Sequence, residues 1–234
     1  LLYGAGLGPL SAHGWEKCAA ALNECADTIV FRERESLAAA REHGVKAPEL
    51  VLGADGALET DVSAAPKEDV LLVCPRQGRG APPFPAEYAR AAAALGAKRG
   101  WKVRYVAMNV RQDLPLCRAL AKETGGEAIE APEDTAALTR LFAAAQFTVS
   151  MRLHALTLSY LAGTPVLGIN GDGRIAAFAA ECGIPYRPSE QSGDIAAALE
   201  AAIEAKAPGT EQWSDRLAAG RAALARALRE KEKK

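Results

Sequence analysis

The stretch QFTVSMRLHALTLSYLAGTPVLGIN, residues 146–170, contains a complete strand–helix–strand pattern. Its two ends, QFTVSM and PVLGIN, are short apolar runs, which is typical of buried strands. The middle, residues 152–163, has the composition of an apolar helix, and Gly163 and Pro165 are the stop signals that end it. This order of elements indicates a βαβ unit, in which the two strands are parallel.

The same alternation of short apolar runs and longer helical patterns continues on both sides of this stretch. Residues 66–207 contain about five strand–helix units, which is the size of a Rossmann-like domain. Residues 1–62 contain three strands and two helices, and the first of these strands is cut short. Between the two blocks, residues 60–69 (TDVSAAPKED) are polar and have no periodicity, which predicts a linker.

We therefore expect an α/β protein with three parts. Residues 1–62 form the C-terminal part of an N-terminal α/β domain that is incomplete. Residues 63–207 form a Rossmann-like domain, and residues 208–234 form a terminal helix whose position favours packing back on the first domain.

Composition and charge exclude several classes of protein. Lys+Arg 28 against Asp+Glu 29 leaves a net charge of -1, so there is no broad basic surface for nucleic acid. No apolar run reaches the ~18 to 20 residues that span a bilayer, and no signal peptide is visible. The five cysteines are scattered without a C-x-x-C pair, which is neither a disulfide framework nor a zinc pattern. We expect a cytoplasmic protein without a metal, either free or near the inner face of the membrane.

Two potential cations, Arg152 and His154, stand where the strand of residues 146–151 passes into the helix. A cation there faces the positive end of the helix dipole, unless a bound anion offsets the repulsion. Ser150 is the predicted N-cap, which places both side chains in or near the first turn. One hypothesis is an anion site with His154 as a base or hydrogen-bond partner. The other is a buried histidine satisfied by a backbone carbonyl, beside an arginine that reaches the surface.

Other loops at the ends of predicted strands carry candidate ligand contacts, because ligands of open parallel sheets bind beyond the carboxyl ends of the strands. Arg76 follows an apolar strand and is either a directed donor for a carboxylate or phosphate, or a surface charge. Arg32 follows the strand 28–31 and is either a cation at the cleft or a solvated charge at a helix start. Asn170, Asp172 and Arg174 lie between glycines, which suits a ligand or an ordinary turn.

The loop GAGLGP, residues 4–9, brings Gly6 and Gly8 to the end of the first strand. It partly matches the dinucleotide pattern G-x-G-x-x-G, but Pro9 stands at the third glycine position. Three interpretations remain open: a dinucleotide site, a tight turn that needs a positive φ, and a turn whose backbone faces a substrate.

Taken in order, these motifs resemble the polysaccharide pyruvyl transferase family. GAGLGP, FRERES with the following VLGAD, and VCPR are similar to its strand-end loops. SMRLHALTLSYLAGTPVLGINGDGRIAAFAAECGIP resembles its most diagnostic stretch, which carries the R-x-H-A motif. The likeness extends over about residues 1–205. There are two departures: the family's usual G-x-x-N-x-G-D opening has no counterpart, and a lysine is usual where Arg174 stands.

The resemblance implies a glycosyltransferase-B-like (GT-B-like) fold, with two Rossmann-like domains. It implies transfer of a pyruvyl group from phosphoenolpyruvate to a sugar of a cell-wall or capsular polysaccharide, with ketal formation and release of phosphate. The expected catalytic residues are His154 and Arg152, and the expected substrate contacts are Arg76, Arg32, Ser150, Asn170, Asp172, Arg174, Gly6 and Gly8.

The same resemblance sets the expected partners. They are phosphoenolpyruvate as donor and a saccharide acceptor, free or lipid-linked, with no cofactor and no nucleic acid. Assembly into a homo-oligomer stays open. Two alternatives stay open: a nucleotide-sugar-dependent glycosyltransferase of the same architecture, and a non-catalytic α/β binding module.

Overall fold

A computed structural model describes residues 1–8, 10–46, 48–62, 64–78, 82–169, 173–188, 191, 193–205 and 209–231. The chain divides into two compact units, which we describe separately. Unit 1 comprises Leu1–Thr60 and Gly209–Lys234, and unit 2 comprises Asp61–Pro208.

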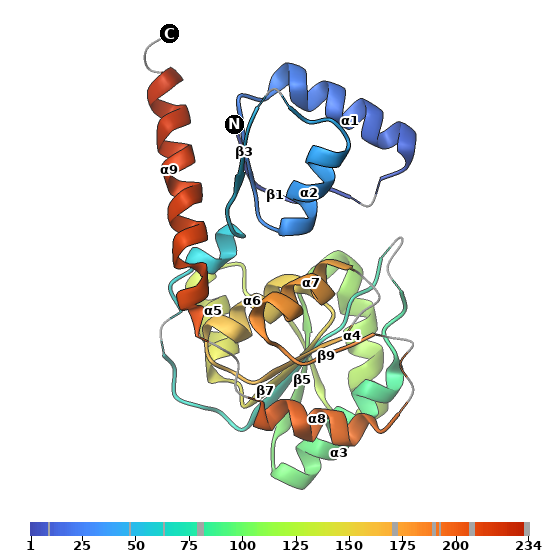
Figure 1. Cartoon of the computed structure of the whole chain (residues 1–234). Coiled ribbons are helices and arrows are strands. Elements are labelled where there is room, and N and C mark those ends of the chain that lie inside the picture. Colours follow the sequence, from blue (N-terminus) through green and yellow to red (C-terminus); the bar gives the residue numbers. More distant parts are fainter. Residues whose placement is uncertain are drawn as a thin grey trace. The chain divides into compact units, whose positions relative to one another are not determined.

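Unit 2 alternates strands and helices along its whole length (Figure 1). Its strands are β4 (Val70–Cys74), β5 (Lys102–Ala107), β6 (Glu127–Glu130), β7 (Phe147–Ser150), β8 (Val166–Ile169) and β9 (Tyr186–Arg187). Its helices are α3 (Ala86–Arg99), α4 (Val110–Thr124), α5 (Thr135–Ala144), α6 (Leu153–Leu161), α7 (Gly173–Cys182) and α8 (Ile195–Glu204). The six strands form one parallel sheet in the order β6-β5-β4-β7-β8-β9. Counted along the unit, this is the order 3-2-1-4-5-6 of a Rossmann fold.

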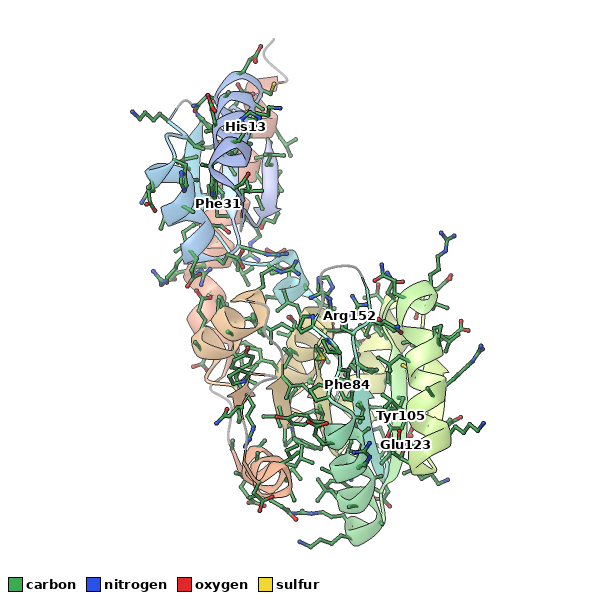
Figure 2. All side chains as sticks on the ribbon, turned by 90° about the vertical axis from the view of Figure 1, so that its right-hand side faces the viewer. His13, Phe31, Phe84, Tyr105, Glu123 and Arg152 are labelled. Carbon is green, nitrogen blue, oxygen red and sulfur yellow. The ribbon has the colours of Figure 1, made fainter. Side chains whose placement is uncertain are left out.

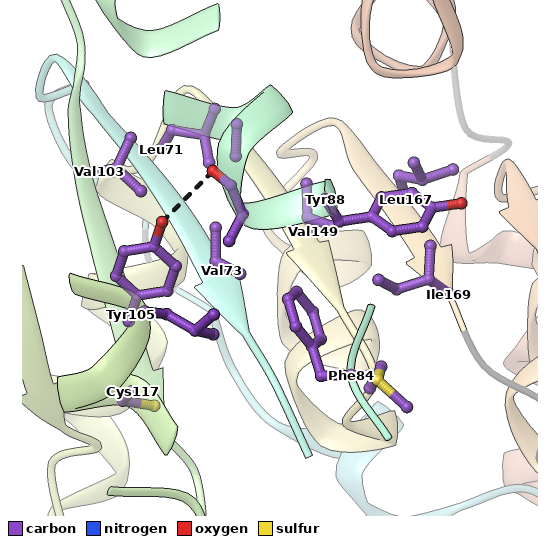
Figure 3. Packing of buried hydrophobic residues seen from close by; sticks show 14 of the residues in the cluster. Leu71, Val73, Phe84, Tyr88, Val103, Tyr105, Cys117, Val149, Leu167 and Ile169 are labelled. Carbon is purple, nitrogen blue, oxygen red and sulfur yellow. Dashed lines mark hydrogen bonds between the residues drawn. The ribbon is translucent and has the colours of Figure 1, made fainter. Parts of the chain in front are cut away.

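The sheet of unit 2 is apolar on both faces, because helices cover both. Along β4, Leu71 and Val73 join a core cluster with residues of α3, α4 and α8. Leu72 and Cys74 point to the other face and pack with residues of α5 and α6. This alternation is the period of two that a strand imposes on its side chains. Figure 3 shows the first cluster, in which the buried Tyr105 hydroxyl donates a hydrogen bond of 3.4 Å to a helix carbonyl.

Unit 1 is a smaller parallel sheet in the order β1-β2-β3, and its elements come from both ends of the chain. They are β1 (Leu2–Ala5), α1 (Ala12–Cys25), β2 (Thr28–Phe31), α2 (Arg34–Glu42), β3 (Glu49–Leu52), the 3₁₀-helices η1 (Gly56–Glu59) and η2 (Thr210–Trp213), and α9 (Ser214–Lys231). Ile29 and Phe31 of β2 are fully buried in a cluster with residues of α1 and α2.

The terminal helix α9 packs on β2 and β3 of unit 1. The helix approaches the sheet closely at Gly220: a Cβ on Gly220 would lie 3.3 Å from Val30 Cγ1 of β2, and a Cβ on Gly53 would lie 3.6 Å from the Gly220 Cα. Arg216 of α9 donates to the carbonyl oxygens of Gly53 (2.7 Å) and Arg32 (2.6 Å). These bonds satisfy two carbonyl groups at the carboxyl ends of the strands.

Three features differ from the sequence-based prediction or were absent from it. The strand β9 was not predicted, because its two residues lie between Pro185 and Pro188 and are too few to show a period. The 3₁₀-helix η1 was also not predicted. Helix α6 begins one residue later than expected, at Leu153. In the part of the chain that the structure describes, no helix combines the length and apolar character needed to cross a membrane.

Candidate functional site

The carboxyl ends of β4 and β7 lie side by side, at the point where the strand order of unit 2 reverses. Cys74 and Ser150 are register partners, and the Met151 N–H donates to the Cys74 carbonyl at 3.0 Å. Arg76 and Arg152 each come two residues after this paired end, so they leave the sheet at the same level. The crevice beyond such a reversal is where open α/β sheets bind ligands.

Ser150 is the last residue of β7, and its hydroxyl shapes the turn into α6. The Ser150 Oγ accepts a hydrogen bond from the Arg152 N–H (2.9 Å) and donates one to the Arg152 carbonyl (3.0 Å). The prediction that Ser150 is the N-cap was therefore wrong: Arg152 holds that position, in an extended conformation. The physical reason is that Ser150 stays in the sheet, paired with Cys74 on one side and Gly168 on the other.

The N-terminus of α6 has no side-chain cap. The first intrahelical bond runs from the Leu156 N–H to the Arg152 carbonyl, so the N–H groups of residues 153–155 have no acceptor within the helix. His154 lies in this first turn and is exposed, and among the described residues none forms a hydrogen bond with its side chain. The helix end therefore offers three N–H donors and an accessible imidazole.

The guanidinium of Arg152 is held from behind by Asp113 of α4. Arg152 Nε lies 3.0 Å from Asp113 Oδ2, and Nη2 lies 2.5 Å from Oδ1, which is a bidentate pair. The Arg152 side chain is 19% exposed, whereas Asp113 is fully buried. Within the described part of the chain, Nη1 of Arg152 has no acceptor. In Figure 2, Arg152 lies above the buried residues Phe84 and Tyr105 of unit 2.

Gln112 and Gly78 flank the same guanidinium. Gln112 Oε1 lies 3.5 Å from Arg152 Nη2, at the limit of a hydrogen bond. Gly78 has a φ of 151°, and a Cβ there would lie 3.0 Å from Gln112 Oε1. A glycine is needed at this position because the backbone conformation is strained for other residues and the space is occupied.

The remaining predicted contacts of unit 2 fall at neighbouring strand ends. Arg76 is half-buried after β4. Arg174 is the exposed second residue of α7, which follows β8. Asn170 and Asp172 lie outside the described residues.

Unit 1 has its own cluster at the carboxyl ends of its strands, formed by the predicted residues Arg32 and Gly6, whereas the predicted Gly8 lies next to Trp15. Arg32 Nη1 lies 3.2 Å from Asp55 Oδ2, and Nε lies 3.8 Å from Glu33 Oε2. A Cβ on Gly6 would lie 2.9 Å from Glu33 Oε1 and 3.0 Å from Arg32 Nη2, so the glycine-rich turn lies directly against these two side chains. Gly8 has a φ of 97°, which requires glycine.

Two thiols lie beneath the Arg152–Asp113 pair. Burial raises the pKa of the Cys74 thiol well above its ordinary value, and the neighbouring Cys117 and Asp113 add to this. Burial raises the pKa of Cys117 to about 12, with a further contribution from the charge of Asp113. Both thiols stay protonated near neutral pH, which makes them packing residues and poor nucleophiles.

The sequence analysis missed Asp113, although a signal for it was present. Asp113, Cys117 and Leu120 follow a spacing of i, i+4 and i+7, which places an acidic residue in the apolar stripe of α4. An acid in such a stripe needs a buried partner. The pattern does not reveal that this partner is Arg152.

One pocket of unit 2 does not belong to the candidate site. A pocket of about 230 Å³ lies at the amino end of β4, where Arg104 and Arg140 face apolar residues of α5. It is at the opposite edge of the sheet from Arg76 and Arg152. Across the described residues, no three His, Cys, Asp or Glu side chains gather as they would around a metal ion.

Comparison with known proteins places the chain in a family. The sequence profile described as "Polysaccharide pyruvyl transferase" matches residues 1–173. The matched range includes Arg32, Arg76, Arg152 and His154 and ends just before Arg174, so it is shorter than the likeness predicted to about residue 205. No curated protein matches the chain at a significant level.

Solved structures with the same fold are sugar-processing proteins of low sequence identity. UDP-N-acetylglucosamine 2-epimerase from Rickettsia bellii has a TM-score of 0.60 at 11% identity, over 89% of this chain and 61% of its own. HepE from Anabaena, in complex with UDP and glucose, has a TM-score of 0.55 at 15% identity, over 91% and 62%. UDP-GlcNAc 2-epimerase from Neisseria meningitidis, bound to UDP-GlcNAc, has a TM-score of 0.59 at 12% identity, over 97% and 68%.

These likenesses establish the architecture. The fold is α/β and GT-B-like, as the sequence analysis predicted. The chain spans less than two thirds of the length of the Rickettsia epimerase and of HepE. With the profile matching residues 1–173, the chain belongs to the polysaccharide pyruvyl transferase family.

Proposed function

We propose that this protein transfers a pyruvyl group from phosphoenolpyruvate to hydroxyl groups of a cell-wall or capsular saccharide, with release of phosphate. One arrangement carries the proposal: Arg152, held by a buried carboxylate, lies next to the uncapped N-terminus of α6 and the exposed His154. Phosphoenolpyruvate carries a carboxylate and a phosphate on a small carbon skeleton. Binding it requires several directed cations and N–H donors in one place.

The residues of unit 2 would divide the binding of this anion between them. Arg152 offers Nη1, and the first turn of α6 offers its backbone N–H groups. Arg76, which leaves the sheet at the same level, adds a second guanidinium, and Arg174 adds a third at the start of α7. Asn170 and Asp172 remain predicted contacts. Arg32 is a weaker candidate, because Asp55 and Glu33 already neutralise its charge.

The proposed reaction makes a ketal and conserves the oxidation level. The methylene carbon of phosphoenolpyruvate gains a proton and becomes a methyl group. Two saccharide oxygens form bonds to the central carbon, while its bond to the phosphate oxygen breaks. The two hydroxyl groups lose one proton each: one balances the new C–H bond and the other leaves with phosphate. No redox cofactor is required.

His154 is the proposed proton-transfer group of this site, since its imidazole is exposed in the first turn of α6. General acid–base catalysis of this kind contributes about 10²–10⁴-fold to a rate. The arginines stabilise the charge that develops on the departing phosphate.

The experiment uses the full-length protein with phosphoenolpyruvate and a panel of disaccharides, free and linked to a polyprenyl carrier. We expect phosphate release that depends on an acceptor, and a product whose methyl group carries one deuterium when the reaction is run in D₂O. His154→Ala should abolish transfer while the protein remains folded by circular dichroism. His13→Ala is the matched control, because His13 is an exposed helical histidine whose contact is with Glu16.

Two results would contradict this proposal. Transfer that persists in His154→Ala removes the proposed role of that residue. A protein that neither binds phosphoenolpyruvate in calorimetry nor releases phosphate with any acceptor is not a transferase of this kind. Binding without turnover would favour a non-catalytic α/β binding module.

A nucleotide-sugar-dependent glycosyltransferase is the second candidate. It is favoured by the fold, since HepE was solved with UDP and glucose, and the Neisseria epimerase was solved with UDP-GlcNAc. Thermal shift separates the two functions. Stabilisation by phosphoenolpyruvate supports the first proposal, and stabilisation by UDP-sugars alone supports the second.

A further inference from the structure

Asp113 is a fully buried carboxylate to which the family match assigns no role. Burying an ionised carboxylate is unfavourable unless donors surround it. An acidic residue near the start of a helix is normally exposed to solvent, where its negative charge interacts favourably with the helix dipole. This interaction does not require the carboxylate to be buried. The position of Asp113 therefore needs another explanation.

Both oxygens of Asp113 are saturated with donors. Oδ1 accepts from the Gln77 backbone N–H (3.0 Å) and from Arg152 Nη2. Oδ2 accepts from the Asn109 backbone N–H (2.9 Å) and from Arg152 Nε. Four donors, two of them on a guanidinium, fix the plane and the rotation of this carboxylate.

The four bonds join the loops that follow three neighbouring strands. Gln77 follows β4, Asn109 follows β5 and Arg152 follows β7, and these strands are adjacent in the order β5-β4-β7. Asp113 thus holds Arg152 against the loops that follow β4 and β5. Two backbone N–H groups fix the carboxylate, and the carboxylate in turn fixes the arginine.

This pairing decides which part of Arg152 remains available. The Nε and Nη2 edge of the guanidinium faces Asp113, and Gln112 lies beside Nη2. Nη1 has no acceptor among the described residues. A flexible arginine loses considerable rotamer entropy when it binds a ligand, and Arg152 has lost it already.

We propose that Asp113 is a positioning residue, which holds the Arg152 guanidinium so that Nη1 is presented to an oxygen of phosphoenolpyruvate at the N-terminus of α6. This inference rests on the proposed function, and it adds a residue that acts through Arg152 without touching the substrate. A solely structural role is the competing explanation, since removing one partner of a buried pair destabilises a protein in any case.

A double-mutant cycle in the full-length protein separates the two explanations. Phosphoenolpyruvate affinity is measured by calorimetry in wild type, Asp113→Asn, Arg152→Ala and the double variant. We expect Asp113→Asn to weaken binding by about 10²-fold when Arg152 is present, as small misplacements of binding groups do. When Arg152 is replaced, the same change should have an effect of about twofold or less. Equal losses in both backgrounds would overturn the proposal.

Asp134→Asn is the matched control for this cycle. Asp134 is also a carboxylate at a helix start, but its side chain caps α5 through the Ala137 N–H at 2.7 Å and has no contact with Arg152. Its replacement should leave phosphoenolpyruvate affinity unchanged. A loss in this variant equal to that in Asp113→Asn would also count against a specific role for Asp113.

A second measurement tests the proposal even if Asp113→Asn does not fold. In wild-type protein labelled with ¹⁵N-arginine, the Arg152 Nε–H should be protected from solvent exchange without any ligand, and Asp113→Glu should reduce this protection. Rapid exchange in wild type would overturn the proposal. A wild-type protein with a protected Nε–H that does not bind phosphoenolpyruvate would instead refute the proposed function, so the two failures are distinct.

Discussion

Each unit has an arginine two residues or fewer beyond a parallel strand, and each arginine is paired with an aspartate. In unit 2, Asp113 occupies one edge of Arg152 and is itself saturated by two backbone N–H groups. In unit 1, Arg32 lies between two carboxylates, Asp55 and Glu33, and its buried Nε has no acceptor among the described residues.

From this difference we infer that an arginine at a strand end is not sufficient for an anion site. A single carboxylate such as Asp113, which is also bound by two backbone N–H groups, occupies only the Nε and Nη2 side of the guanidinium and leaves Nη1 for a ligand. Two carboxylates around a guanidinium leave the group with an excess of negative charge, which repels an anion. The two units can therefore be tested against each other, one variant in each.

The largest expected difference concerns the reactivity of one thiol in each unit. Cys25 of unit 1 is exposed, whereas Cys117 lies in the core under Asp113. A thiol whose pKa is about 12 is ionised in roughly one molecule in 10⁴ at pH 8. We expect iodoacetamide to label Cys25 at least about 10³-fold faster than Cys117, measured by mass spectrometry of the native protein. Similar rates would mean that solvent reaches the region under Arg152.

The next difference concerns stability. Asp113→Ala leaves Arg152 without its partner and should cost about 3–5 kcal/mol, as is usual when a buried ion pair is broken. Asp55 is partly exposed and caps η1, so Asp55→Ala should cost only about 1 kcal/mol. Urea denaturation, combined with hydrogen exchange to assign each loss to its unit, measures both. A larger loss for Asp55→Ala would reverse the comparison.

A smaller difference is expected in catalysis. Arg152→Ala removes a donor to the proposed anion and should lower kcat/KM for phosphoenolpyruvate by about 10²-fold. Arg32→Ala removes a guanidinium that is already neutralised, and its effect should stay within about tenfold. Phosphate release gives both values. If Arg32→Ala is the more damaging variant, the assignment of the anion site to unit 2 is wrong.

The smallest difference concerns two glycines. Gly78 has a positive φ and contacts Gln112, so Gly78→Ala should cost about 1 kcal/mol and displace Gln112 from Arg152. Gly6 has no positive φ, and the Cβ of an alanine at this position would contact only the ends of the Arg32 and Glu33 side chains. We expect a severalfold rise in KM for phosphoenolpyruvate in Gly78→Ala and little change in Gly6→Ala. The same steady-state assay checks both.

The strand–helix–strand pattern of residues 146–170 was predictable because its signals are local. Apolar runs mark β7 and β8, and Gly163 and Pro165 end the intervening helix within a few residues. The same alternation predicted an α/β protein with Rossmann-like blocks, and the family resemblance predicted that its fold is GT-B-like. The strand β9 could not be found in this way, because its existence depends on pairing with β8 and not on its own two residues.

The site was predictable in part for the same reason. Arg152, His154 and Arg76 come directly after apolar strands, and that position is visible in the sequence. The start of α6 was misplaced because Ser150 is kept in the sheet by partners on two other strands. Asp113 was missed because its partner is 39 residues away in the chain. Non-local pairing of this kind leaves only the weak signal of an acid in an apolar stripe.

The attachment of α9 to β2 and β3 has a consequence for how the protein is made. Unit 1 is assembled from both ends of the chain, whereas unit 2 is continuous between them. A ribosome releases the whole of unit 2 before α9 exists, a delay on the order of 10 seconds at ordinary translation rates. During that time the face of Val30 and Gly53 has no covering helix. Unit 2 can fold as it emerges, whereas β2 and β3 must wait for α9, so this sheet is the part of the two units most vulnerable to aggregation and proteolysis until α9 has been made.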